Sequence, residues 1–234
     1  MTANRTVVCW LWSDGERSYL PEHVNILHRM FRRHLPGEFR FVCITDDKGE
    51  FDAGVEVMPT PPAAKALANL KTPEGGRFPS CYRRLWLFSD EAKGLGDRVL
   101  LVDIDLLVVA DASPLFAPTA DFVGWKPTQS WGHNNRRIGG GIYLLTPGAK
   151  PEVWNDFKGD RSIAEARRAG YRGSDQAWLS YKLWGCPLFG KGIYSIRDLR
   201  NGAMPCPKDA ILIQHNGSVK PWTSRVKWVQ EAWR

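Results

Sequence analysis

The stretch "RVLLVDIDLLVVAD", residues 98–111, is an apolar run that holds two carboxylates, Asp103 and Asp105, near its middle. The apolar residues before them are typical of a central strand that is buried on both faces. We therefore expect this strand to meet the carboxyl edge of a sheet near Asp103. Open α/β sheets bind their ligands at that edge.

The rest of the chain alternates strand and helix patterns, which indicates an α/β fold with a mostly parallel central sheet flanked by helices. Turn residues and the spacing of apolar side chains set the bounds of the expected elements. We expect strands within residues 6–12, 39–47, 54–59, 98–111, 121–125, 139–146 and 210–215, and helices within 20–37, 61–78, 79–96, 151–169, 174–183 and 224–234.

The composition is that of one globular domain of 234 residues, with no apolar stretch near the roughly 20 residues of a membrane helix. The N-terminus lacks the apolar core of a secretory signal, which predicts a cytoplasmic protein. Five cysteines without a C-x-x-C spacing predict buried free thiols. The net charge of +7 suits a phosphate-bearing partner, whether a nucleotide, an anionic acceptor, a membrane face or nucleic acid.

The two aspartates can act together because side chains at i and i+2 of an extended chain point to the same side. Two converging carboxylates repel each other unless a cation lies between them, and hard oxygen ligands favour Mg²⁺ or Mn²⁺. The structural alternative is that one aspartate caps a turn and the other is solvated.

A second cluster, "ILIQHNGSVKPW", residues 211–222, places His215 at the end of an expected strand. His215 can bind a metal, Gly217 lets the backbone approach a phosphate closely, and Lys220 supplies a positive charge for a diphosphate. Taken alone, the cluster also fits a surface turn with an incidental histidine. Together with the aspartates it offers the groups that a metal diphosphate site needs.

Five motifs in a fixed order resemble those of the metal-dependent GT-A glycosyltransferases, above all family 8, which includes glycogenin and bacterial lipopolysaccharide galactosyltransferases. They are "YRRLWL" (82–87), "VLLVDIDLLVV" with "SPLF" (99–116), "GGGIYLL" (139–145), "SDQAWLS" (174–180) and "HNGSVKPW" (215–222). The resemblance implies one Rossmann-like GT-A domain over residues 1–234. In such a domain, residues 1–105 mainly bind the nucleotide, and residues 106–234 mainly bind the sugar and the acceptor.

The resemblance also implies roles for single residues. Asp105 with His215 would bind Mn²⁺ or Mg²⁺, while Asp103 would bind the metal and also touch the ribose or the sugar, with Ile104 between them at the donor. Arg84 would contact the donor sugar and phosphates, and its neighbour Arg83 is a competitor for that role.

Further positions match the diphosphate, sugar and base subsites of the family. Gly217 and Lys220 would hold the diphosphate, and Asp175 and Gln176 would lie near the donor sugar and the acceptor. The uracil would lie near the end of the first strand and the second, at Trp10, Trp12, Ser13 and Asp46.

The implied reaction is transfer of a hexose from a UDP-sugar to a saccharide or lipid-linked saccharide acceptor, with retention of configuration. In a retaining enzyme Gln176 or Asp175 would face the anomeric carbon, whereas in an inverting enzyme Asp175 is the first candidate for the base. Peripheral contact with a membrane is compatible with this reaction.

Two departures from family 8 concern the site. The spacing here is H-x-G-x-x-K-P-W, which is one residue shorter before the glycine than the family pattern, and "GGG" (139–141) replaces the usual N-x-G. The shorter spacing alters the phosphate loop, and the glycines remove the usual asparagine contact to the sugar.

Two alternatives use other chemistry. One is a phosphatase of the haloacid-dehalogenase type, which also has a D-x-D motif, although Leu107 replaces its usual Thr or Val. The other is a glycosyltransferase or binding protein that acts on nucleic acid, for which the chain lacks zinc spacing, RNP-like aromatics and a concentrated basic helix.

Overall fold

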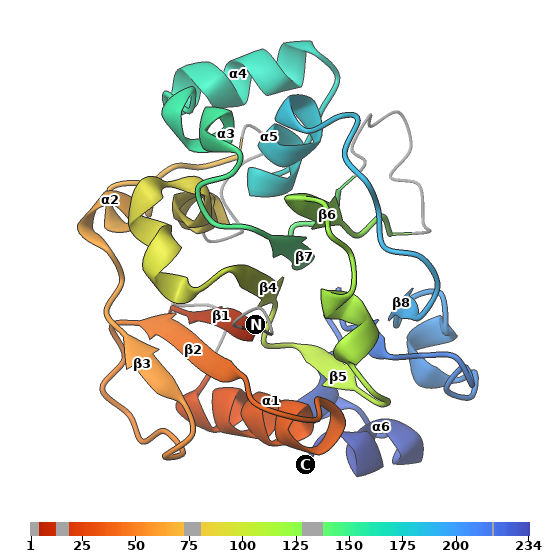
Figure 1. The fold of residues 1–234 in the computed structure, drawn as a ribbon. Coiled ribbons are helices and arrows are strands. Elements are labelled where there is room, and N and C mark those ends of the chain that lie inside the picture. The colour runs from red at the N-terminus through yellow and green to blue at the C-terminus, as the bar shows by residue number, and fades with distance from the viewer. Residues whose placement is uncertain (1–4, 13–18, 73–80, 128–137, 217) are drawn as a thin grey trace.

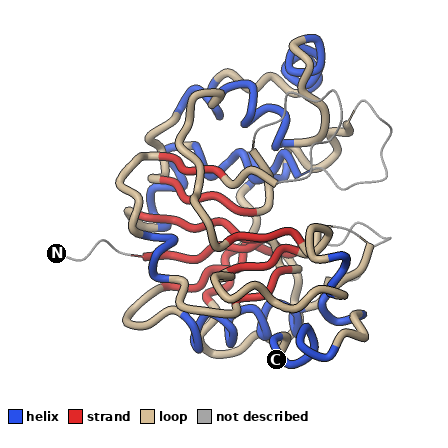
Figure 2. Tube along the Cα trace, turned by 90° about the vertical axis from the view of Figure 1, so that its right-hand side faces the viewer, coloured by secondary structure: helices blue, strands red, loops and turns tan. Residues whose placement is uncertain are grey.

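The computed structural model describes residues 5–12, 19–72, 81–127, 138–216 and 218–234, and within them two sheets lie between helices (Figures 1 and 2). The larger sheet has the strand order β3-β2-β1-β4-β7-β6, and the smaller has the order β5-β9-β8. The strands are β1 (Arg5–Leu11), β2 (Arg40–Thr45), β3 (Glu56–Met58), β4 (Arg98–Val102), β5 (Leu106–Val108), β6 (Phe122–Gly124), β7 (Ile142–Leu145), β8 (Ile193–Ser195) and β9 (Leu212–Gln214).

The large sheet is mostly parallel, as predicted, because β3, β2, β1 and β4 pair in parallel and only β7 runs against its neighbours. Figure 1 shows α1 and α6 at one end of the molecule and α3, α4 and α5 at the other. The α-helices are α1 (Pro21–His34), α2 (Pro62–Lys65), α3 (Pro151–Asn155), α4 (Asp160–Arg168), α5 (Asp175–Lys182) and α6 (Lys227–Ala232).

Strand β1 shows why the central strands are apolar throughout. Val7 and Cys9 pack toward α1, whereas Val8 and Trp10 face the opposite core, which includes the 3₁₀ helix η1 (Cys81–Phe88). Successive side chains of a strand point to opposite faces, so a strand covered on both sides must be apolar at every position.

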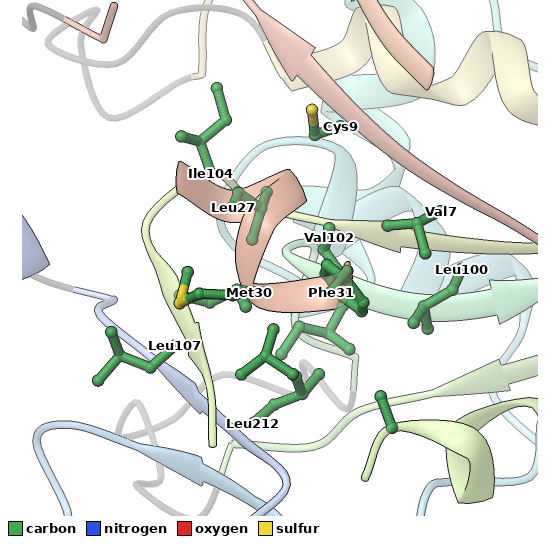
Figure 3. Packing of buried hydrophobic residues seen from close by; sticks show 14 of the residues in the cluster. Val7, Cys9, Leu27, Met30, Phe31, Leu100, Val102, Ile104, Leu107 and Leu212 are labelled. Atoms are coloured by element: carbon green, nitrogen blue, oxygen red, sulfur yellow. The ribbon is translucent and has the colours of Figure 1, made fainter. Parts of the chain in front are cut away.

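One core extends from the large sheet to the small one. Figure 3 shows side chains of α1 packed against those of β1 and β4, with residues of β5 and β9 in the same cluster. Pro21 begins α1, and the apolar face of the helix holds Val24, Leu27, Met30 and Phe31, as expected from their spacing, while Leu35 packs into the same core directly after the helix. Helix α1 thus packs against strands of both sheets and holds them together.

Several expected elements are divided in the structure. The run 98–111 forms two strands, β4 and β5, which belong to different sheets. In place of the one helix expected at 79–96, the described residues from 81 onward form η1 and a second 3₁₀ helix, η2 (Asp90–Leu95), because the backbone of Ser89 between them is extended. Residues 151–169 form α3 and α4, separated at Gly159, whose φ is +57°.

Other features bear on the remaining expectations. Strand β8 was not predicted from the sequence. All five cysteines are free, as expected, but only Cys9 and Cys43 are fully buried. None of the helices in the described part of the chain combines the length and apolarity needed to cross a membrane.

Candidate active site

The two aspartates lie where the chain passes from the large sheet to the small one. Asp103 follows β4, and its amide donates to the carbonyl of Gly141 at a distance of 2.8 Å. Asp105 precedes β5, and its carbonyl accepts the amide of His215 at 2.9 Å. Because each aspartate prolongs a different ladder, residues 103–105 form the junction between the two sheets.

Arg84 of η1 is buried between two carboxylates. Its Nε and Nη2 donate to the carboxylate of Asp175 at 2.8 and 3.1 Å, and its Nη1 donates to Oδ1 of Asp103 at 2.5 Å. Burial raises the pKa of both carboxyl groups, while the attraction of Arg84 opposes the rise. A single guanidinium therefore balances two carboxylates, Asp175, which is fully buried, and Asp103, whose side chain is 31% exposed, and it links η1 to the end of β4 and to the first residue of α5.

Glycine makes room for the second hydrogen bond of Asp103. Oδ2 of Asp103 accepts from Nε2 of Gln214 at 2.7 Å, across the backbone of Gly141. A Cβ at Gly141 would overlap both of these side-chain atoms. At Gly140 a Cβ would lie 3.0 Å from Oδ1 of Asp175. The "GGG" run thus lets the backbone of this segment pass close to the carboxylates of Asp103 and Asp175.

Gln214 is a site residue that the sequence reasoning missed. The carboxylate of Asp103 can only accept, so the amide nitrogen of Gln214 must face it. Its Oε1 is buried and finds no hydrogen-bond partner among the described residues. In the sequence, the feature that could have indicated this role is the position of Gln214 directly before His215, at the end of an expected strand.

Asp105 is paired with a lysine from the second cluster. The ammonium of Lys220 forms an ion pair and hydrogen bond with Oδ2 of Asp105, and the hydroxyl of Tyr19 donates to the same oxygen at 3.0 Å. The side chain of Asp105 is 7% exposed, and that of Lys220 is 13% exposed. The chain itself therefore supplies the cation for this carboxylate.

His215 lies opposite Asp105 and is fully buried. Its Nδ1 is 3.2 Å from the carbonyl of Val219, and because a carbonyl only accepts, the proton is on Nδ1. Burial lowers the pKa of His215 to about 4. The ring is therefore neutral at pH 7, and the lone pair of Nε2 has no partner among the described residues.

Asp105 and His215 are the two side chains here that would contribute ligands to a divalent cation, and the described residues contain no group of three His, Cys, Asp or Glu side chains placed to hold one. A neutral imidazole with a free Nε2 and a fixed Nδ1–H is the usual state of a metal-binding histidine. The ammonium of Lys220 occupies the carboxylate as a stand-in ion. Asp103 is engaged instead by Arg84 and Gln214.

Three of the residues predicted for the base, Trp10, Trp12 and Asp46, lie within the described part of the chain. Trp10 is 6% exposed and packs edge-to-face against Trp12 and Trp86, so it is a core residue. Trp12 is half-buried, and the guanidinium of Arg83 lies 4.5 Å from its ring centroid. Arg83 and Arg84 therefore point to different places, the former to Trp12 and the latter to Asp103.

The remaining predicted residues have distinct surroundings. Asp46 is exposed, pairs with Lys65 at 3.0 Å and accepts the amide of Thr60. Gln176 is half-buried, and its Oε1 accepts the amide of Gly140 at 3.4 Å. Ile104 is buried in the core beside α1 (Figure 3), so only its backbone can face a ligand. Ser13 and Gly217 lie outside the described residues.

No protein-family model and no curated protein sequence matches the chain. Among solved structures, the galactosyltransferase LgtC in complex with donor and acceptor sugar analogues is similar with a TM-score of 0.62 at 16% identity, over 97% of this chain and 91% of LgtC. The glycosyltransferase GlyE of Streptococcus pneumoniae TIGR4 is similar with a TM-score of 0.59 at 15% identity, over 98% of this chain and 59% of GlyE. Mouse xyloside xylosyltransferase 1 has a TM-score of 0.55 at 11% identity, over 91% of this chain and 98% of its own. The chain thus has the GT-A fold of these glycosyltransferases.

Proposed function

We propose that the protein is a metal-dependent glycosyltransferase that moves a hexose from a UDP-sugar to a saccharide or lipid-linked saccharide. The observation that carries the proposal is the junction of the two sheets, where Arg84, Asp103, Asp105, His215 and Lys220 converge from three separate segments. The fold of LgtC, GlyE and mouse xyloside xylosyltransferase 1 supports the same reaction class.

Charge at the leaving group sets the requirement for such a reaction. Cleavage of the bond between sugar and diphosphate leaves negative charge on the nucleotide, and preorganised cations stabilise that charge. Asp105 and Nε2 of His215 would hold a divalent cation, Mn²⁺ or Mg²⁺, which supplies Lewis-acid stabilisation of the diphosphate when bound. Lys220, from the loop after His215, supplies a second positive charge beside it.

Asp175 is held in a way that supports retention of configuration. It is fully buried, and its two oxygens accept the two hydrogen bonds from Arg84, with Ser174 donating to Oδ1 at 2.9 Å. A base for an inverting reaction must instead reach the acceptor hydroxyl. In our proposal Asp175 positions Arg84, and Gln176, at the start of α5 beside Gly140, is the residue near the anomeric carbon.

The phosphatase alternative requires Asp103 as a nucleophile. Both oxygens of Asp103 already accept hydrogen bonds, one from Arg84 and one from Gln214. These two hydrogen bonds fix the orientation of the Asp103 carboxylate and occupy both of its oxygens. We therefore favour the transferase over the phosphatase.

The test is binding of UDP with and without Mn²⁺, measured by calorimetry. The substitution Asp105→Asn should abolish the Mn²⁺-dependent part of UDP binding. The melting temperature of this variant without ligand shows whether its fold is intact. Asp97→Asn is the matched control, because Asp97 is exposed at the opposite end of β4. Unchanged Mn²⁺-dependent binding in Asp105→Asn would overturn the metal assignment.

A screen of nucleotide sugars by thermal shift and by donor hydrolysis would then identify the donor, since ligands that bind the native state raise its melting temperature. A response to UDP-hexoses supports the proposal, whereas a response to other nucleotides alone would contradict it. A steep fall of acceptor binding with salt would favour an anionic acceptor, such as nucleic acid.

A further inference from the structure

The counter-ion of Asp105 determines how a metal ion and a nucleotide can bind to the proposed site. Lys220 and Asp105 form a largely buried pair, and Tyr19 donates to the same carboxylate oxygen. A carboxylate so poorly exposed is strongly destabilised without a cation beside it. In the ligand-free protein Lys220 meets that need.

A divalent cation at Asp105 and His215 must compete with this ammonium. Two cations at one carboxylate repel each other, and the repulsion is strong where water is excluded. The ammonium therefore has to leave the carboxylate when the metal arrives. It then needs another anion, because an unpaired buried ammonium is also strongly destabilised.

The backbone around Lys220 allows such a movement of the side chain alone. The amide of Lys220 donates to Oγ1 of Thr223 at 3.1 Å, and the amide of Thr223 donates back to the carbonyl of Lys220 at 3.1 Å. These bonds fix the backbone at the start of the short 3₁₀ helix η5 (Pro221–Thr223). The four-carbon stem of the lysine is flexible and can carry the ammonium to a different partner.

We infer that Lys220 is an exchangeable counter-ion, which holds Asp105 in the ligand-free protein and moves to the diphosphate when metal and nucleotide bind together. The inference rests on the proposed function and adds that neither ligand binds tightly alone. The diphosphate accepts the displaced ammonium, and the metal takes its place on Asp105. By linkage, each ligand must raise the affinity for the other by the same factor.

The test is Mn²⁺ binding in the absence of any nucleotide, followed by the decrease in the free Mn²⁺ signal in electron paramagnetic resonance. Lys220→Met removes the charge and keeps the length of the side chain. We expect this variant to bind Mn²⁺ alone at least tenfold more tightly than the unmodified protein. Its UDP affinity should fall much more than its uridine affinity, and the mutual enhancement of Mn²⁺ and UDP should be largely lost.

Two further variants separate competition from structural damage. Lys220→Arg keeps the charge and should retain the weak binding of Mn²⁺ alone. Lys93→Met is the matched control, because Lys93 pairs with Asp90 in an exposed ion pair and should leave every constant unchanged. If Lys220→Met does not fold, Lys220→Gln is measured in its place.

The outcomes distinguish this inference from the proposed function. If the unmodified protein shows no Mn²⁺-dependent binding of UDP, the proposed function fails. If that binding is present but Lys220→Met binds Mn²⁺ alone no better than the unmodified protein, the exchange is wrong and Lys220 only organises the site.

Discussion

Replacement of Arg84 by methionine should destabilise the protein far more than the same replacement of its neighbour Arg83. Arg84 is 5% exposed and donates three hydrogen bonds to two carboxylates, one of which, Asp175, is fully buried. Removing one partner of a buried ion pair costs about 3–5 kcal/mol. The contact of Arg83 with Trp12 is partly exposed, and such cation–π contacts contribute about 0.5–1 kcal/mol. The difference between the variants should therefore be about 3 kcal/mol.

The free energy of unfolding in urea, followed by tryptophan fluorescence and circular dichroism, measures this difference. The pH dependence gives a second readout. Without Arg84 the pKa values of Asp103 and Asp175, which burial already raises, must rise further. A carboxyl whose folded pKa exceeds its unfolded value destabilises the fold above the folded pKa, and this cost disappears as the pH falls below it.

The loss of unfolding free energy in Arg84→Met, relative to the unmodified protein, should therefore become smaller as the pH is lowered from 7 toward 4. Equal losses in Arg84→Met and Arg83→Met, or a deficit that does not change with pH, would refute the reasoning. Such results would mean that the two carboxylates find other compensation when the guanidinium is absent.

Three other changes test separate parts of the structure. Gly141→Ala should displace the two side chains that its Cβ would overlap and weaken binding of a UDP-sugar at least tenfold in calorimetry, whereas Gly94→Ala, which meets open space, should have no effect. Trp12→Leu should weaken the binding of uridine and of UDP by the same factor, about tenfold, because the indole would stack on the base. Unequal losses of affinity for the two ligands would contradict this role of Trp12. Burial lowers the pKa of His28, while the charge of Asp52 opposes this, so the titration of His28 leaves the stability unchanged well above pH 6.5 and disfavours folding as the pH falls below that value. His28→Gln should therefore lose less melting temperature between pH 7 and pH 5.5 than the unmodified protein, and an identical loss would contradict the assignment.

The central strands could be predicted because each is a continuous apolar run. That same property hides the break within residues 98–111. Ile104, the single residue between Asp103 and Asp105, is as apolar as the strand residues on either side of the two aspartates, so it does not mark the change of sheet. The change is set by β9, which pairs with β5 from more than 100 positions away along the chain. Local sequence patterns carry no information on such a partner.

The chemical groups of the site could be predicted more readily than the ion pairs that they form with one another. The paired carboxylates predicted a need for a cation, and the spacing of "HNGSVKPW" predicted a basic group nearby. Which cation serves which carboxylate depends on three-dimensional contacts, and the structure gives Arg84 to Asp103 and Lys220 to Asp105. Gln214 escaped prediction because its role depends on the glycine opposite Asp103.

The two cations of the site differ in how firmly they are held, and this difference suits a site that gains and loses ligands. Arg84 donates three hydrogen bonds to two carboxylates, whereas the ammonium of Lys220 donates to one carboxylate, Asp105, and at 3.5 Å to the carbonyl of His215. With neutral His215, the three carboxylates and two cations leave one net negative charge in a chain whose overall charge is +7. A divalent cation alone would reverse that charge, and a UDP-sugar alone, with one negative charge on each phosphate, would triple it. Joint binding of the two leaves the buried charge unchanged, which is the electrostatic reason to expect that metal and nucleotide sugar enter this site as partners.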